Sequence, residues 1–281
     1  MAVRRRCLPP GWYPGDAEGI REALAEWSLA RAPAAAAKAA VAPHAGWAYS
    51  GRLAYLAIAS LEEAETVAVI GGHSPGYAPA VAAAEEGFET PLGTIDADLE
   101  LRAALARILS ERQGGRLALK GDDAPDNSVE IQLPLVQARF PKARLLWLRA
   151  PNGPKALALG EDLARAAREM GRKVVCLGST DLTHYGPAYD FMPAGRGPEA
   201  ARWVREVNDR GFIEALLAMD AEAVLERGEE DRSACSSGAA AAALVFAAAS
   251  GAARAELLAY ATSLERRQDE SFVGYAGVAF Y

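Results

Sequence analysis

Short, continuously apolar runs alternate with amphipathic segments along most of this chain. Polar, glycine or proline clusters bound the runs, and the segments between them repeat apolar residues every three or four positions. The runs predict strands at 38–42, 66–70, 81–85, 143–148, 173–177, 256–261 and 272–280. The amphipathic segments predict helices at 17–30, 50–61, 96–111, 126–139, 154–170, 199–218, 220–227 and 233–249.

This alternation of strands and helices is typical of an α/β fold. Continuously apolar strands belong to a parallel sheet that helices cover on both faces. No internal repeat and no change in composition marks a domain boundary, and 31–37 is only a short alanine-rich linker. We therefore expect one domain over 1–281, a three-layer αβα structure with a mainly parallel central sheet.

Two polar side chains stand where predicted helices begin. Asp16 precedes the helix at 17–30, and Ser50 opens the helix at 50–61. A side-chain oxygen at such a position accepts one of the free backbone N–H groups of the first turn. We expect both residues to act as N-caps.

The composition narrows the classes of function. A net charge of −7 over 281 residues argues against a general binder of nucleic acids or anionic membranes. No apolar run approaches the roughly 18 residues that a membrane-spanning helix needs. A basic start without an apolar core is no signal peptide, so we expect a cytoplasmic protein. Its three cysteines are too few for a disulfide framework.

All three histidines of the chain, His44, His73 and His184, follow predicted strands. In α/β folds the carboxyl ends of the strands are where ligands bind. The glycines around His73 indicate that the backbone there approaches another group closely. Asp181 precedes His184 by three residues and could orient it as a base or support a metal site. Simpler interpretations exist for the same residues. His44 could be a loop residue that hydrogen-bonds to the backbone, and Asp181 and His184 could cap the start of a helix.

Two histidines at neighbouring strand ends could bind one metal ion, since neutral imidazole is the commonest side-chain ligand of first-row metals. A third ligand is then needed, and the sequence offers four candidates for it: Cys235, Asp181, His184 and Glu130. Cys235 stands at the start of a predicted helix, where the helix dipole favours a thiolate, although it could equally be a small buried residue. Cys176 lies inside an apolar strand and is expected in the core.

Several common catalytic motifs are absent from the sequence. It has no Gly-x-Gly-x-x-Gly turn after a strand, no phosphate-binding loop, no Gly-x-Ser-x-Gly elbow and no Cys-x-x-Cys pair. Nucleotide-dependent chemistry and serine hydrolysis therefore have no support in the motifs.

Several segments, in order along nearly the whole chain, resemble the motifs of the Memo-like family. They are 11–14, 41–51, 70–73, 128–134, 179–186, the cysteine at 235, and 269–277. Memo-like proteins are similar in fold to class III extradiol ring-cleavage dioxygenases, and the resemblance implies that fold here.

The resemblance also implies a site. His44, His73 and Cys235 would bind a metal, and Asp181 and His184 would line the same pocket, with His184 as acid or base and Asp181 orienting it. Family members bind iron or copper there, so iron is the expected cofactor, with copper and zinc as alternatives. A thiolate in place of the carboxylate of the dioxygenases favours softer ions such as Cu(I). The expected function is a redox or oxygenase-like enzyme acting on a small molecule or peptide held in the pocket.

Two other functions stay open at this point. One is a binding or scaffold protein that keeps the pocket without turnover, as animal relatives act in signalling. The other is a zinc hydrolase, because two histidines and a cysteine can bind catalytic zinc. Prokaryotic relatives often occur beside a radical-SAM protein, which implies a functional link to one.

The chain departs from the family pattern at two places. Asn127 stands where relatives have a histidine, and His73 is shifted by one residue within its motif. If the missing histidine serves as an acid or base in relatives, this protein lacks that group.

Overall fold

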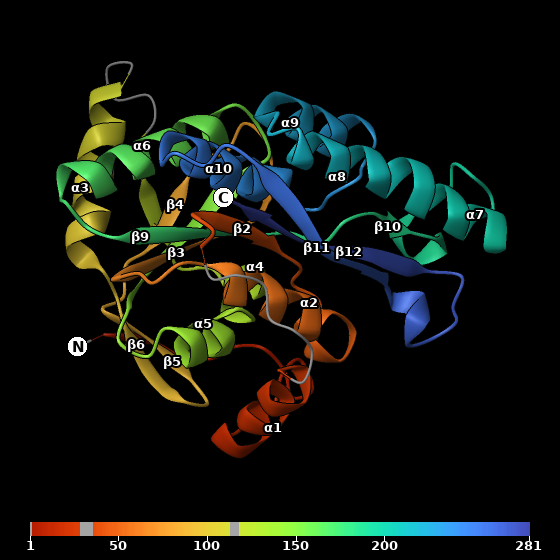
Figure 1. The fold of residues 1–281 in the computed structure, drawn as a ribbon, viewed down its shortest axis with the longest axis horizontal. Helices are drawn as coiled ribbons and strands as arrows, with labels where there is room; N and C mark the ends of the chain where they lie inside the picture. Colours follow the sequence, from red (N-terminus) through yellow and green to blue (C-terminus); the bar gives the residue numbers. More distant parts are fainter. Residues whose placement is uncertain (1, 29–35, 113–117) are drawn as a thin grey trace.

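A large mixed sheet runs through the molecule (Figure 1). The computed structural model describes residues 2–28, 36–112 and 118–281. Within these residues nine strands follow the order β10-β12-β2-β9-β3-β8-β4-β7, with β11 beside β12. The strands are β2 (Ala39–Ala42), β3 (Thr66–Ser74), β4 (Val81–Ala83), β7 (Lys120–Asp122), β8 (Arg144–Pro151), β9 (Val174–Ser179), β10 (His184–Tyr185), β11 (Ala255–Thr262) and β12 (Phe272–Phe280).

The centre of this sheet is parallel, and an antiparallel pair joins each side of this centre to the next strand. Strands β2, β9, β3 and β8 are parallel neighbours, so that Ile70 of β3 lies between Gly178 and Leu148. Antiparallel pairs continue the sheet from β2 to β12 and from β8 to β4. The prediction of an α/β fold is confirmed. The sheet is mixed because β12 pairs antiparallel with β2, β10 and β11, and β4 pairs antiparallel with β8.

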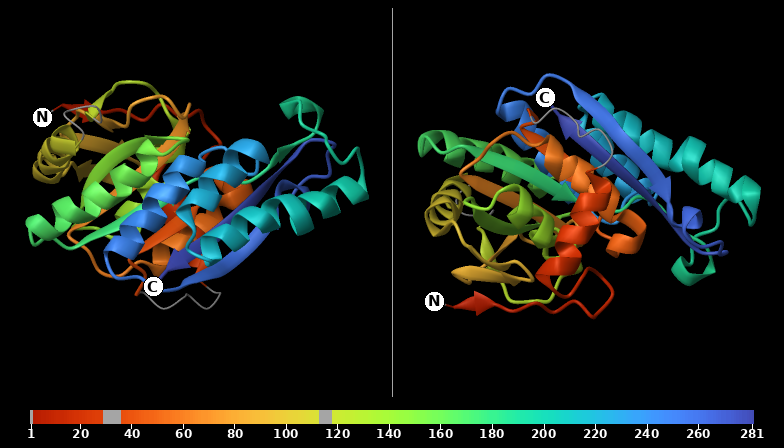
Figure 2. Two further views of the ribbon diagram at one scale, coloured as in Figure 1. Left: turned by 90° about the horizontal axis from the view of Figure 1, so that it is seen from above. Right: turned by 60° about the horizontal axis from the view of Figure 1, so that its bottom comes forward.

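Helices cover both faces of the sheet (Figures 1 and 2). In β3, Ala68 and Ile70 belong to one core cluster, and Val67 and Val69 to the other. The first cluster includes residues of α3 (Leu99–Glu111), α6 (Lys155–Glu169), α8 (Asp209–Leu217), α9 (Ala221–Glu230) and α10 (Ser237–Ala249). The second includes α1 (Ala17–Trp27), α2 (Trp47–Ser60), α4 (Asn127–Glu130), α5 (Leu133–Arg139) and the small sheet of β1 (Val3–Arg4), β5 (Gly87–Thr90) and β6 (Gly93–Asp96).

Helix α10 packs against the central strands because its residues are small. Most of its alanines are buried, and it contacts β2, β3, β8 and β9. A Cβ atom on Gly160 of α6 would lie 2.2 Å from the carbonyl oxygen of Ala242, so the backbones of α6 and α10 are in close contact at this glycine. This packing sets the start of α10, and with it Cys235, over the carboxyl end of the parallel strands.

Several element boundaries differ from the sequence-based expectation. Asp16 does cap α1, accepting from the N–H of Gly19, but α2 begins at Trp47 and its N-cap is Gly46. Ser50 lies inside α2 and donates to the carbonyl of Ala45, so its prediction as a cap was wrong. The linker predicted at 31–37 lies mostly outside the described residues.

Two helices that were predicted as continuous are interrupted. The segment predicted at 126–139 splits into α4 and α5, because Pro134 has no N–H to donate to the carbonyl of Glu130. The segment predicted at 199–218 contains a π-helical turn, Val204–Asn208, between α7 (Pro198–Trp203) and α8. Such turns add one residue to a helix and are frequent at functional sites.

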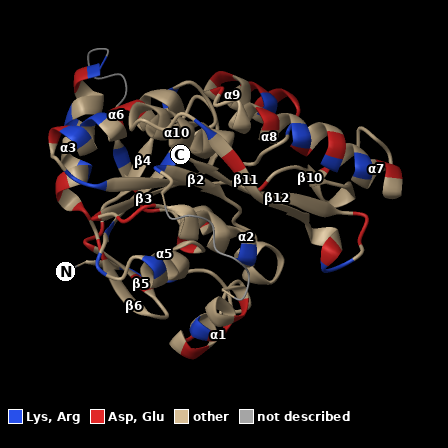
Figure 3. Cartoon of the chain, viewed as in Figure 1, with Lys and Arg blue, Asp and Glu red and all other residues tan. Residues whose placement is uncertain are grey.

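Charged residues lie mainly on the outer faces of the helices. Basic and acidic residues are interspersed along α3 and α8 (Figure 3). Many form pairs one helical turn apart, such as Arg107 with Glu111 and Arg210 with Glu214, and such exposed pairs contribute little to stability. Across the described ranges, none of the helices combines the length and the apolar character that crossing a bilayer requires.

Candidate metal centre

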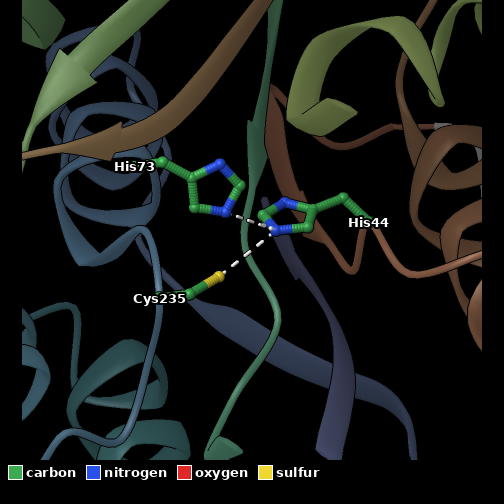
Figure 4. A group of neighbouring side chains, drawn as sticks. All are labelled: His44, His73 and Cys235. Atoms are coloured by element: carbon green, nitrogen blue, oxygen red, sulfur yellow. Dashed lines mark hydrogen bonds between the residues drawn. The ribbon is translucent and has the colours of Figure 1, made fainter. Parts of the chain in front are cut away.

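His44, His73 and Cys235 meet at the carboxyl edge of the parallel strands (Figure 4). Nε2 of His44 lies 3.1 Å from Nε2 of His73 and 3.2 Å from Sγ of Cys235. Donor atoms of all three residues lie within 4.8 Å of one another. His44 follows β2, His73 lies near the end of β3, and Cys235 directly precedes the N-cap of α10. The fold thus assembles this group from three distant parts of the chain.

The spacing of these atoms suits a single ion. Nitrogen and sulfur ligands of a tetrahedral ion, at bond lengths near 2.1 and 2.3 Å, lie about 3.4–3.6 Å apart. The two contacts of His44 Nε2 are a few tenths of an ångström shorter, so small side-chain shifts would open the group to that spacing. Two imidazoles and a thiolate are a donor set for zinc, iron or copper.

Hydrogen bonds hold the backbone of His44 and the ring nitrogen that faces away from His73 and Cys235. Its backbone N–H donates to Oδ1 of Asp181 at 2.6 Å, and its ring Nδ1 lies 3.3 Å from Oγ of Ser179. Gln132 donates to that same Ser179 Oγ and to the carbonyl of Pro43. With Nδ1 engaged, the ring presents Nε2 to the group, which is how histidine ligands are usually oriented.

His73 adopts a left-handed backbone conformation, with φ of +62°. Few non-glycine residues do so, and they cluster at functional sites. A Cβ on Gly71 would lie 2.2 Å from Ser128 Oγ, and one on Gly72 2.3 Å from Ser236. The glycines before His73 therefore let β3 pack between α4 and the start of α10, which is the close approach that the sequence indicated.

The thiol of Cys235 lies among positive charge. Burial alone would raise its pKa, but the charge of His44 and the neighbouring imidazoles of His184, His44 and His73 lower that pKa well below its ordinary value. The backbone is also fixed, since its N–H donates to the carbonyl of Asp181 and its carbonyl accepts from the side chain of Asn152. The residue can therefore present a thiolate, the form that binds metals.

Asp181 and His184 lie beside this group. Oδ1 of Asp181 accepts the backbone N–H groups of His44 and Ala45, so the carboxylate mainly fixes the loop after β2. Its Oδ2 lies 3.9 Å from Nε2 of His184, too far for a hydrogen bond. Within the described part of the chain, that buried Nε2 has no hydrogen-bond partner. The ring of His184 nevertheless lies in the wall of the neighbouring cavity.

A cavity of about 500 Å³ opens at the centre. Its aromatic lining consists of Trp12, Tyr49, Tyr189 and Tyr275, and His44, His73, Asp181 and His184 lie in its wall. The ring of His184 lies 4.8 Å from the ring of Tyr189. Asn127, the departure from the family pattern, also lines the cavity. This volume lies within the range of about 300–1,000 Å³ that is typical of small-molecule sites.

Glu130, one of the candidates for a third ligand, is not part of this group. Its buried carboxylate accepts the backbone N–H groups of Cys7 and Leu8 and the hydroxyl of Tyr13. It fixes the N-terminal segment that carries Trp12 to the wall of the cavity. Ser179, Gln132 and the Asp126 beside His73 were missed from the sequence, because nothing but the fold brings these polar residues to the histidines.

The turn that carries Asp181 and His184 is held from behind by a buried carboxylate. Asp209, at the end of the π-helical turn, accepts the N–H of Thr183 at 3.0 Å and the hydroxyl of Tyr260 at 2.8 Å. Burial, opposed by these hydrogen bonds and by the nearby charge of His184, raises the pKa of Asp209 to about 6.

This raised pKa makes the stability depend on pH. The folded protein binds the proton of Asp209 more tightly than the unfolded chain, whose value is 3.8. As pH rises through this window, the buried charge therefore lowers the free energy of unfolding. Between pH 4 and 7.5 the wild type should lose about 2 kcal/mol relative to Asp209→Asn. Urea unfolding of both proteins measures this difference, and a difference that is constant with pH would contradict the assignment.

Comparisons with known proteins agree with one another. A family model described as "Memo-like protein" matches residues 4–279. A "MEMO1 family protein" of Thermococcus onnurineus is 32% identical and covers 99% of this chain and 99% of the relative. One of Archaeoglobus fulgidus is 31% identical with the same coverage. A third, of Methanococcoides burtonii, is 34% identical over 85% of this chain and 84% of the relative.

A solved structure is also similar. It is the crystal structure of an uncharacterized protein from Escherichia coli K12, with 14% identity and a TM-score of 0.49, covering 86% of this chain and 99% of that one. The family model matches nearly the whole chain, and relatives more than 30% identical align over nearly their whole length. The chain therefore belongs to the Memo-like family.

Proposed function

We propose that this protein is a metal-dependent redox enzyme of the oxygenase-like kind, which binds iron through His44, His73 and Cys235. The observation that carries the proposal is the convergence of two Nε2 atoms and a thiol within 4.8 Å. Each imidazole has a separate partner for its Nδ1, so the donor atoms are oriented for an ion. Copper is the alternative metal, because a thiolate favours softer ions.

The cavity beside the three donor atoms would hold the substrate. When bound, the metal would supply redox and Lewis-acid chemistry. Trp12, Tyr49 and Tyr275 would exclude water and contact a planar substrate, since aromatic side chains bury much surface with little loss of freedom. His184, whose ring lies in the wall of the cavity, would exchange a proton with the substrate. Asp181 would keep the His44 loop in place.

The metal content of the protein, purified without oxygen, tests this proposal. About one equivalent of iron or copper per chain, with a change of oxidation state on exposure to O₂, is the expected result. Zinc alone, without redox activity, would overturn the redox assignment in favour of a hydrolase. Absence of any first-row metal, even after reconstitution, would favour a binding or scaffold protein and overturn the metal assignment.

A further inference from the structure

A buried carboxylate lies directly behind His73. Oδ2 of Asp126 is 3.4 Å from Nδ1 of His73, on the side of the ring opposite to the donor atom Nε2. Oδ1 of Asp126 accepts the N–H of Ser128 at 2.9 Å, because Asp126 is the N-cap of α4. The helix start thus engages one oxygen of the carboxylate, and the second oxygen is the one that reaches His73.

One guanidinium lies next to this second oxygen. Arg149 on β8 donates through Nε, at 2.8 Å, and through Nη2, at 2.5 Å, to the two carboxylate oxygens of Asp122. Its remaining nitrogen, Nη1, lies 3.4 Å from Oδ2 of Asp126. The side chain of Arg149 is 15% exposed, and those of the two aspartates are nearly inaccessible. Arg149 therefore joins both ends of the loop at 122–126.

The other contacts of this cluster hold the loop but do not reach His73. The indole N–H of Trp147 donates to Oδ2 of Asp122 at 3.1 Å. The guanidinium of Arg4, from β1, lies 4.6 Å from the ring of Trp147 and donates to the backbone carbonyl of Asp122. Of these side chains, Arg149 alone contacts the carboxylate of Asp126.

We propose that Arg149 is a positioning residue for the metal centre, which acts through Asp126. By binding Asp122 with two nitrogens and Asp126 with the third, it directs Oδ2 of Asp126 toward Nδ1 of His73. That contact holds the ring with Nε2 toward His44 and Cys235. A planar guanidinium, unlike an ammonium, can contact two carboxylates at fixed angles. This inference rests on the proposed function, since it concerns a residue that shapes the same metal site.

Outer partners of metal ligands typically change metal affinity by a factor of about 10 to 100 when removed. We therefore expect Arg149→Gln and Asp126→Asn each to weaken binding of Co²⁺ to the full chain by about that factor. The electronic absorption spectrum of bound Co²⁺ reports on ligand geometry and should also change. A merely structural role would lower the melting temperature and leave both the affinity and the spectrum unchanged.

The chain offers a matched control in Arg112. It donates through Nε and Nη2 to the two oxygens of Asp162, both at 2.8 Å, which is the same two-point geometry away from the centre. Arg112→Gln should lower the melting temperature without altering Co²⁺ affinity or spectrum. If Arg149→Gln fails to fold, Asp126→Asn and Arg149→Lys make the same comparison, and Arg149→Lys should restore only part of the affinity.

The outcomes separate this inference from the proposed function. If the wild type binds neither Co²⁺ nor Fe²⁺, the metal assignment itself fails. If the wild type binds Co²⁺ and the folded Arg149 and Asp126 variants bind it equally well with an unchanged spectrum, the positioning role alone is overturned.

Discussion

Replacing His44 with alanine should weaken metal binding about a thousandfold. His44 is the member of the group that contacts both others, through Nε2 to His73 and to Cys235. A structural zinc site with four ligands gains about 10–16 kcal/mol on binding, or roughly 2.5–4 kcal/mol per ligand. A loss of about 4 kcal/mol corresponds to about three powers of ten in affinity. Competition with a chelator of known affinity, under anaerobic conditions, measures the change.

His184 provides the matched control for this variant. It is a histidine in the wall of the same cavity, but it is not one of the three donor residues. His184→Ala should keep metal affinity within a few-fold of the wild type, although it removes a neighbour of the Cys235 thiol. Similar losses in both variants would show that the cavity as a whole, and not the group around His44, governs binding.

Glu130→Ala should lower the free energy of unfolding by about 4 kcal/mol and release the N-terminal segment. The carboxylate accepts the N–H groups of Cys7 and Leu8 at 2.9 and 3.0 Å and the hydroxyl of Tyr13 at 2.9 Å. Hydrogen bonds to charged groups contribute about 1.5–3 kcal/mol each, and they are not fully additive. Urea unfolding gives the free energy, and trypsin cleavage after Arg5 or Arg6 reports release of the segment.

An exposed glutamate in an ion pair serves as the control. Glu63 pairs with Arg139, and its side chain is 83% exposed, so Glu63→Ala should change stability by less than about 0.5 kcal/mol. Glu130→Gln, which keeps one acceptor oxygen, should fall between the two. Equal stability and equal resistance to trypsin in Glu130→Ala and Glu63→Ala would contradict the anchoring role of Glu130.

Features that depend on local sequence were predictable. The buried strands and the histidines after them follow from runs of apolar residues, and these strands do form the parallel centre of the sheet. The split at Pro134 was missed, because one continuous helix was predicted over 126–139, although proline cannot continue a helix there. Among the strands that were missed, β5, β6 and β7 are short and carry glycine and charged residues, which weakens the apolar pattern.

Features that depend on distant contacts were not predictable from pattern alone. Cys235 and His44 are separated by 191 residues. The residues alone left Cys235 as one of four candidates for the third ligand, and the family resemblance chose it. The pair of Asp181 and His184 suggested that one orients the other, yet the carboxylate turns mainly to the backbone of the His44 loop. Nothing in the sequence marks Arg149 as a neighbour of Asp126, because β8 and the loop at 122–126 meet only in the folded sheet.

An anomalous-difference map of the metal-loaded crystal, recorded at the iron and copper edges, tests the central claim most directly. We expect one peak within bonding distance of Nε2 of His44, Nε2 of His73 and Sγ of Cys235. A map without a peak at this position, or with the metal bound elsewhere on the chain, would contradict it.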